Sequence, residues 1–181
     1  MRNIRLYRLA LTALFSALCC VATLVIQLPA PATGGYIHLG DCFVLLSGFC
    51  LGPFWGGLAA GIGSALADVL TGYAQYVPAT FVIKLLMALV AGVLCRFLLK
   101  KERRTWLTVV VYALAGVCAE AIMVVGYFAY EAVVLGYGWG ALASVPLNLV
   151  QGGVGFALAC LLVGLLRQIP SLRRALSAFY R

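Results

Sequence analysis

Long apolar segments dominate this chain and constrain its fold more than any other feature. Segments of about twenty residues follow one another, each ended by proline, glycine or charge, without the in–out alternation of barrel strands. As helices, such segments cross a bilayer with all their backbone hydrogen bonds satisfied internally. Hydrophobic residues make up 65% of the chain and charged residues 10%, unlike the balance of a soluble domain. The sequence therefore predicts an all-α integral membrane protein with one domain over residues 1–181.

Six membrane-spanning helices are expected from the positions of these segments. The first segment has no convincing small-x-small cleavage site, so it is interpreted as a helix rather than a signal peptide. The segment Asp41–Gly72 is divided at "GPFW", and its first part is too short to cross about 30 Å at about 1.5 Å per residue. This part begins earlier, tilts, or forms a re-entrant hairpin with the second part. The expected helices are about Leu9–Leu28, Asp41–Gly72 as two, Ala79–Leu99, Thr105–Tyr130 and Ser144–Arg167.

Positive charge separates the connecting segments into two classes. Of the 13 basic residues, all except Lys84 precede the first helix, lie from the end of the fourth helix to the start of the fifth, or lie at or after the end of the sixth. The opposite connections, around residues 29–40, 72–79 and 136–143, contain none. The positive-inside rule then places both termini in the cytoplasm, with residues 1–8 as the N-terminus and 168–181 as a basic tail. The net charge of +8 therefore needs no nucleic acid to explain it.

Ionisable residues inside the apolar segments are the second informative feature. Leaving Asp68, Lys84 and Glu120 unpaired in lipid would cost on the order of 8–10 kcal/mol. Asp68 and Lys84 are equidistant along the chain from Tyr76 at a turn, so an ion pair between them is geometrically easy. Such a pair is either structural or part of a ligand contact. Because these groups lie beneath the outer surface, we expect them to face one another, water or a ligand.

Other polar residues are expected at the same depth. In "PLNLVQGG", Asn148 and Gln151 are three residues apart on one helix face, where they either contact a ligand or hydrogen-bond between helices. Asp41 is expected to be an N-cap. Glu120 and Tyr127 share a face with Glu131, which could instead snorkel to the outer interface.

Tyrosines are concentrated on the same side, which favours a pocket that stacks a flat aromatic ring over a simple interfacial belt. The tyrosines and the tryptophan expected there are Tyr36, Tyr73, Tyr76, Tyr127, Tyr130, Tyr137 and Trp139. His38 stands alone, so no metal site is expected, and the 7 cysteines are interpreted as small packing residues. Gly57, Gly61 and Ala65 recur at every fourth position and favour close helix packing.

Motifs of catalysis are absent from the sequence. It contains no GxxxxGK[ST], no HExxH and no G-x-S-x-G, so neither a P-loop ATPase nor a hydrolase is expected, and no cofactor is called for. Two inverted halves are also not evident, which argues against a self-sufficient carrier. A stand-alone proton-coupled carrier using Asp68, Lys84 and Glu120 nevertheless stays open as the alternative.

Four blocks of sequence resemble the S components of energy-coupling-factor (ECF) vitamin transporters, in particular the riboflavin-type branch. The blocks are "GGYIHLGDCFVLLSG", "LGPFWGGLAAGIGSALADVLTGY", "YVPATFVIKLLMALVAG" and "PLNLVQGG", and the resemblance covers about Ala10–Gly164. It implies a six-helix binding protein of the cell membrane, with a vitamin pocket near the outer face capped by the loop after the first helix. It also implies three partner chains: a transmembrane coupling protein and two cytoplasmic ATPases.

Individual residues follow from the resemblance. Ala13 and Ala17, with Ala10 one turn earlier, resemble the family's AxxxA docking motif for the coupling protein. Asn148 matches a substrate-contacting asparagine of riboflavin-specific members, but Gln151 stands where those members have lysine. A pyridoxine-like or hydroxymethylpyrimidine-like compound is therefore as plausible as riboflavin. The candidate substrate contacts are Asn148, Gln151, Lys84, Tyr36, His38, Glu120, Tyr127, Asp68 and Asp41.

Overall fold

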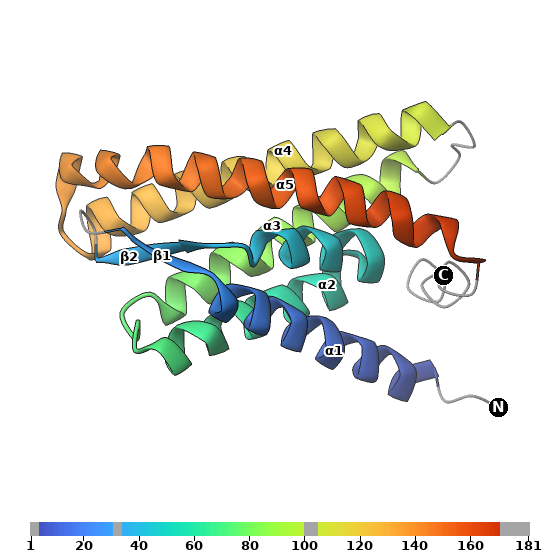
Figure 1. Ribbon diagram of the computed structural model, residues 1–181, viewed down its shortest axis with the longest axis horizontal. Coiled ribbons are helices and arrows are strands. Elements are labelled where there is room, and N and C mark those ends of the chain that lie inside the picture. The colour runs from blue at the N-terminus through green and yellow to red at the C-terminus, as the bar shows by residue number, and fades with distance from the viewer. Residues whose placement is uncertain (1–3, 31–33, 100–104, 171–181) are drawn as a thin grey trace.

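A computed structural model of the chain describes residues 4–30, 34–99 and 105–170. Among these residues, five helices are long and apolar enough to cross a membrane. A π-helical turn at Tyr130–Val134 and a 3-10 turn at Gly138–Ser144 connect the last two helices. In chain order the other elements are α1 (Ile4–Val25), β1 (Gln27–Ala30), β2 (Gly35–His38), α2 (Asp41–Thr71), α3 (Val77–Leu98), α4 (Thr105–Ala129) and α5 (Val145–Gln168) (Figure 1).

The two ends of the helix bundle differ in what they contain. The β1–β2 hairpin, the α2–α3 turn and the α4–α5 connection gather at one end, which we call the hairpin end (Figure 1). At the opposite end α1 begins, α3 ends, α4 begins and α5 ends. Arg96 and Arg167 lie in the last turns of α3 and α5, so their charges belong to this second end. The other basic residues assigned to that side lie outside the described residues, except for Arg5 and Arg8.

Helix α2 is broken in its middle. Gly52 has φ 74° and ψ −175°, a conformation that favours glycine, and Pro53 follows it. Beyond the break the chain turns back on itself. The Ser47 hydroxyl of the first arm therefore comes close enough to the second arm to donate a hydrogen bond to the Gly56 carbonyl at 3.0 Å. The predicted division at "GPFW" is thus confirmed, and the first arm of α2 is re-entrant. That arm covers only about 16 Å at about 1.5 Å per residue, so six complete spans are not confirmed.

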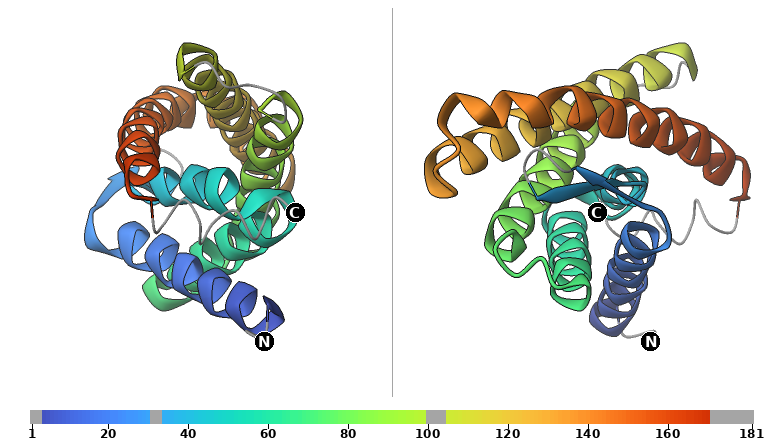
Figure 2. Two further views of the ribbon diagram at one scale, coloured as in Figure 1. Left: turned by 90° about the vertical axis from the view of Figure 1, so that its right-hand side faces the viewer. Right: turned by 60° about the vertical axis from the view of Figure 1, so that its left-hand side comes forward.

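The first arm of α2 lies in the centre of the bundle, with the other helices around it (Figure 2). Apart from Phe43, every residue from Asp41 to Gly52 is buried. This position explains why the arm is apolar on all its faces, as expected for a helix with no exposed side. It also carries Asp41, at the N-terminus of the arm, into the interior.

Glycines bring α2 close to its neighbours. A Cβ atom added at Gly61 would lie 2.9 Å from the Phe81 carbonyl oxygen of α3, and one added at Gly57 would lie 3.2 Å from the Leu85 carbonyl oxygen. The close packing predicted for this stripe of small residues is confirmed.

The hairpin after α1 is absent from the sequence-based prediction. Helix α1 ends at Val25 rather than near Leu28, and the next residues pair as antiparallel strands with Leu28 opposite Ile37. Each strand has only four residues, and Pro29 lies in the first, so the pattern indicates a loop rather than a sheet. Contacts with the helices, described next, hold the hairpin in place.

Candidate functional site

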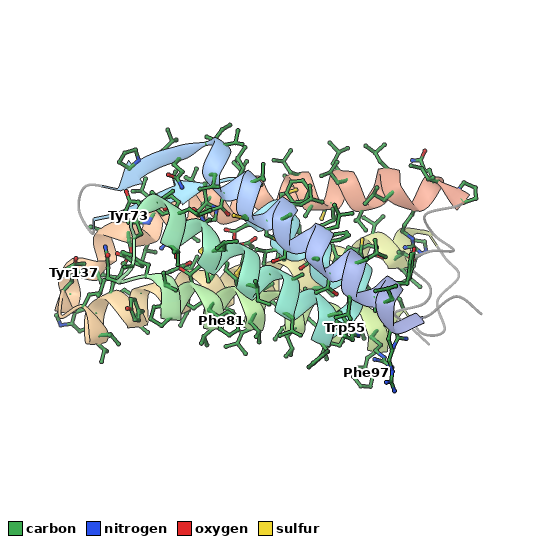
Figure 3. All side chains as sticks on the ribbon, turned by 90° about the horizontal axis from the view of Figure 1, so that it is seen from below. Trp55, Tyr73, Phe81, Phe97 and Tyr137 are labelled. Carbon is green, nitrogen blue, oxygen red and sulfur yellow. The ribbon has the colours of Figure 1, made fainter. Side chains whose placement is uncertain are left out.

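A cavity opens at the hairpin end, between β2 and the nearby ends of α2 to α5. Its empty space, counted together with the part open to solvent, is about 460 Å³. Tyr73 and Tyr137 lie at this end, whereas Trp55 and Phe97 lie toward the other (Figure 3). The described residues that line the cavity are Gly35, Tyr36, Ile37, His38, Asp68, Tyr76, Thr80, Tyr127, Glu131, Ser144, Leu147, Asn148 and Gln151.

A buried polar network lies behind the inner wall of this cavity and reaches it through His38 and Gln151. Lys84 of α3 donates to Asp41 Oδ1, and both side chains are 0% exposed. Gln151 of α5 donates from Nε2 to Asp41 Oδ2 at 2.6 Å, and its Oε1 accepts the backbone N–H of His38 at 2.9 Å. Opposite charges therefore neutralise each other away from water, and one amide links α2, α5 and the hairpin. This network accounts for a lysine within an apolar segment.

The pairing differs from two sequence-based expectations. Lys84 pairs with Asp41, whereas Asp68 Oδ1 accepts a hydrogen bond from the Tyr36 hydroxyl at 2.6 Å. Distance from a turn predicts the depth of a residue but not the direction of its side chain around the helix. Asp41 is also not an N-cap: Gly40 holds that position, and the Asp41 carboxylate points into the network. The re-entrant arm brings Asp41 beside Lys84, and no local pattern indicates this.

His38 fixes the turn between the hairpin and α2. The backbone N–H of Gly40 donates to His38 Nδ1 at 2.9 Å, so this ring nitrogen acts as an acceptor. Burial lowers the pKa of His38 to about 4, and the ring is therefore neutral at physiological pH. Among residues 4–30, 34–99 and 105–170, no group of three or more His, Cys, Asp or Glu residues could hold a metal.

Glu131 lies inside the protein rather than at the lipid interface. Its side chain is 3% exposed, and it accepts hydrogen bonds from the Tyr76 hydroxyl at 3.1 Å and the Ser144 hydroxyl at 2.5 Å. The interpretation of this residue as snorkelling is therefore wrong. Its π-helical turn lets it reach Tyr76 of the α2–α3 turn and Ser144 before α5, and so ties three segments together.

Three tyrosines, Tyr36, Tyr76 and Tyr127, line the cavity. Tyr36 packs against Tyr73 with ring centroids 4.5 Å apart, and Tyr76 packs against Tyr127 at 6.4 Å. The Tyr127 hydroxyl is 3.0 Å from the Thr80 hydroxyl, and the Lys84 ammonium lies 5.3 Å from the centre of the Tyr127 ring. The predicted concentration of tyrosine at this end is confirmed. Flat faces beside hydroxyl groups suit an aromatic ligand with polar substituents.

Six of the nine candidate contacts line the cavity, namely Tyr36, His38, Asp68, Tyr127, Asn148 and Gln151. Asp41 and Lys84 lie behind the wall, whereas Glu120 of α4 faces Gly152. Both Glu120 carboxylate oxygens are buried without a hydrogen-bond partner among the described residues. The sequence-based list lacks Tyr76, Thr80, Glu131 and Ser144; the spacing of four residues from Tyr76 to Thr80 to Lys84 indicates two of them.

The alanines of α1 lie on its outer surface. Ala10, Ala13 and Ala17 are exposed, whereas the opposite side of the helix packs against α2, where a Cβ added at Gly63 would lie 2.2 Å from the Ser16 carbonyl oxygen. A smooth face is therefore available to a partner helix.

The family follows from comparison with known proteins. The model of the family described as the S component of ECF-type riboflavin transporters matches residues 3–168. The chain belongs to this family. It is therefore a multi-pass membrane protein of a family that takes up vitamins, a family of transport components rather than enzymes. The resemblance found in the sequence is confirmed.

Individual relatives differ in what they transport. An uncharacterized protein of Pyrococcus woesei is 35% identical over 146 residues, which are 76% of this chain and 92% of the relative. The thiamine precursor transporter HmpT of Lactococcus lactis is 29% identical over 170 residues, 93% of this chain and 92% of HmpT. The crystal structure of the biotin S component of an ECF-type ABC transporter has a TM-score of 0.69 and 19% identity, covers 100% and 99% of the two chains, and shows the shared fold.

Proposed function

We propose that this chain is the substrate-binding subunit of an ECF-type importer. It captures a small aromatic vitamin or vitamin precursor at the extracellular side and delivers it inward when coupled to a transmembrane protein and two ATPase subunits. The cavity at the hairpin end carries this proposal, because it combines aromatic faces with polar groups at one end of an apolar bundle. Arg96 and Arg167 at the opposite end support an orientation with the hairpin outside and both termini in the cytoplasm.

We propose ligand contacts for cavity residues whose polar atoms form no hydrogen bond with another described residue. The side-chain amide of Asn148 makes no hydrogen bond to another described residue, although the residue is only 8% exposed. The oxygen and the nitrogen of the Gln151 amide both form hydrogen bonds within the polar network, so we propose that Gln151 holds the cavity wall in place rather than contacting the ligand.

The alternative, a stand-alone proton-coupled carrier, has less support. A proton relay needs ionisable groups that exchange protons along a path. Lys84 and Asp41 instead form a closed pair, and Asp68 belongs to a separate hydrogen bond with Tyr36.

Reconstitution of the purified chain in liposomes distinguishes the two functions. The importer subunit binds its vitamin without net transport, and uptake appears only when the coupling protein and both ATPases are present with ATP. Uptake by the chain alone, driven by a proton gradient, would instead establish the carrier.

Asn148→Ala is expected to weaken binding of the transported vitamin by at least about 1 kcal/mol, because the variant loses a hydrogen bond in a buried site. Isothermal titration calorimetry measures this change. The adjacent Leu149 is 59% exposed on the outside of the bundle, so Leu149→Ala serves as the matched control and should bind as the wild type does. Equal affinities of Asn148→Ala and the wild type would remove Asn148 from the site.

A further inference from the structure

The charged groups that line the cavity are acidic. Asp68 and Glu131 are lining residues, whereas the lining residues that the structure describes include no lysine or arginine. Lys84 is the nearby cation, but its ammonium is engaged by Asp41, and His38 is neutral. A ligand in this cavity therefore meets negative charge that no lining cation offsets.

The two acids differ in how their oxygens are used. Both Glu131 oxygens accept hydrogen bonds from neighbouring hydroxyl groups. Asp68 is only 3% exposed, and its Oδ1 accepts the Tyr36 hydroxyl, but its Oδ2 has no hydrogen-bond partner among the described residues. The Thr80 hydroxyl is a further donor beside the Asp68 carboxylate. It also lies 3.0 Å from the Tyr127 hydroxyl, and no hydrogen bond from Thr80 to Asp68 Oδ2 is formed. A buried carboxylate oxygen without a donor is costly, so this oxygen needs a donor from elsewhere.

We infer that Asp68 selects the ligand by accepting a hydrogen bond from an N–H group on an aromatic heterocycle, such as the amino group of an aminopyrimidine. This inference rests on the proposed function and narrows its substrate class. An amino group supplies the donor that Asp68 Oδ2 lacks, and the bond is strong because the acceptor is charged. The free Asn148 amide offers a donor and an acceptor to the ring, and the tyrosines offer flat faces.

The same geometry excludes anionic ligands. A carboxylate or phosphate ester on the vitamin would add negative charge beside Asp68 and Glu131, in a setting where charges are poorly screened. An uncharged aminopyrimidine therefore fits this cavity better than a phosphorylated vitamin or a vitamin that carries a carboxylate.

Matched ligands test the inference directly. The probe is 4-amino-5-hydroxymethyl-2-methylpyrimidine, and its counterpart carries a methyl group in place of the amino group. The two compounds have the same shape, but the second has no N–H donor. Titration calorimetry on the wild-type protein is expected to give at least about tenfold weaker binding for the methyl compound.

Matched variants show that Asp68 is responsible. Asp68→Asn retains an acceptor for Tyr36 but places an uncharged amide at the other position, and it should weaken binding of the amino compound at least about tenfold. Leu149→Ala, at a residue that is 59% exposed on the outside of the bundle, is the control and should bind the amino compound as the wild type does. Thermal unfolding in detergent verifies that both variants are folded.

The outcomes separate this inference from the proposed function. Equal binding of the amino and methyl compounds, or unchanged binding in Asp68→Asn, would overturn the role of Asp68. Binding of riboflavin or pyridoxine with the same affinity in wild type and Asp68→Asn, and none of the aminopyrimidine, would overturn it as well, while leaving the subunit a vitamin-binding protein. Absence of binding to all of these vitamins and precursors would contradict the proposed function itself.

Discussion

Lys84→Met is expected to lower the free energy of unfolding by about 3–5 kcal/mol, the usual loss when one partner of a buried ion pair is removed. Methionine fills much of the same space but leaves the Asp41 carboxylate charged at a position with 0% exposure. The one remaining side-chain donor to that carboxylate among the described residues is Gln151. Chemical denaturation in detergent, followed by circular dichroism, measures the change.

A double variant separates the loss of charge balance from the loss of packing. Lys84→Met combined with Asp41→Asn removes both charges, and the asparagine still offers an oxygen to the Gln151 amide. We expect the double variant to recover most of the stability lost by Lys84→Met. If Lys84→Met alone cost less than about 1 kcal/mol, or if the double variant were no more stable than the single one, the ion pair would not hold the centre of this bundle.

Ala13→Trp is expected to abolish assembly with the coupling protein. Ala13 lies on the exposed face of α1, and an indole ring there would hold a partner helix away from the close contact that small residues allow. Co-purification of the tagged chain with the coupling protein and the two ATPases measures assembly. Vitamin binding should be unchanged, because the cavity lies at the hairpin end between β2 and the ends of α2 to α5.

An exposed alanine on another helix supplies the control for this variant. Ala121 lies on the surface of α4, so Ala121→Trp adds the same ring to the lipid-facing surface without touching α1. We expect Ala121→Trp to assemble normally. Normal assembly of Ala13→Trp would show that the coupling protein binds a different face.

Much of the fold follows from local patterns in the sequence. Helix positions, the break near Gly52 and the side assigned to Arg96 and Arg167 depend on apolar length, glycine or proline, and charge, which act within one segment. The same local patterns identify Lys84 as a basic residue within an apolar segment. Asn148 and Gln151 both line the cavity, which agrees with their spacing of three residues on one helix face.

Pairings between distant segments are not predictable in this way. Asp41 meets Lys84 because the first arm of α2 turns into the centre of the bundle, and the sequence marks the break without giving the direction of the return. Tyr36 meets Asp68 because a hairpin of two short strands folds over the cavity, and its composition resembles that of a loop. The burial of Glu131 is not predictable for a similar reason, because its partners Tyr76 and Ser144 come from other segments.

Native mass spectrometry of the purified protein tests most directly whether the cavity beneath the hairpin holds a small aromatic molecule. We predict a complex of one chain with one vitamin-sized molecule for the wild type and for Ala13→Trp, and loss of that molecule from Asn148→Trp, whose indole would fill the cavity. A bound molecule retained in full by a folded Asn148→Trp variant, or a wild-type chain that stays empty after incubation with riboflavin, pyridoxine and the aminopyrimidine, would contradict this assignment.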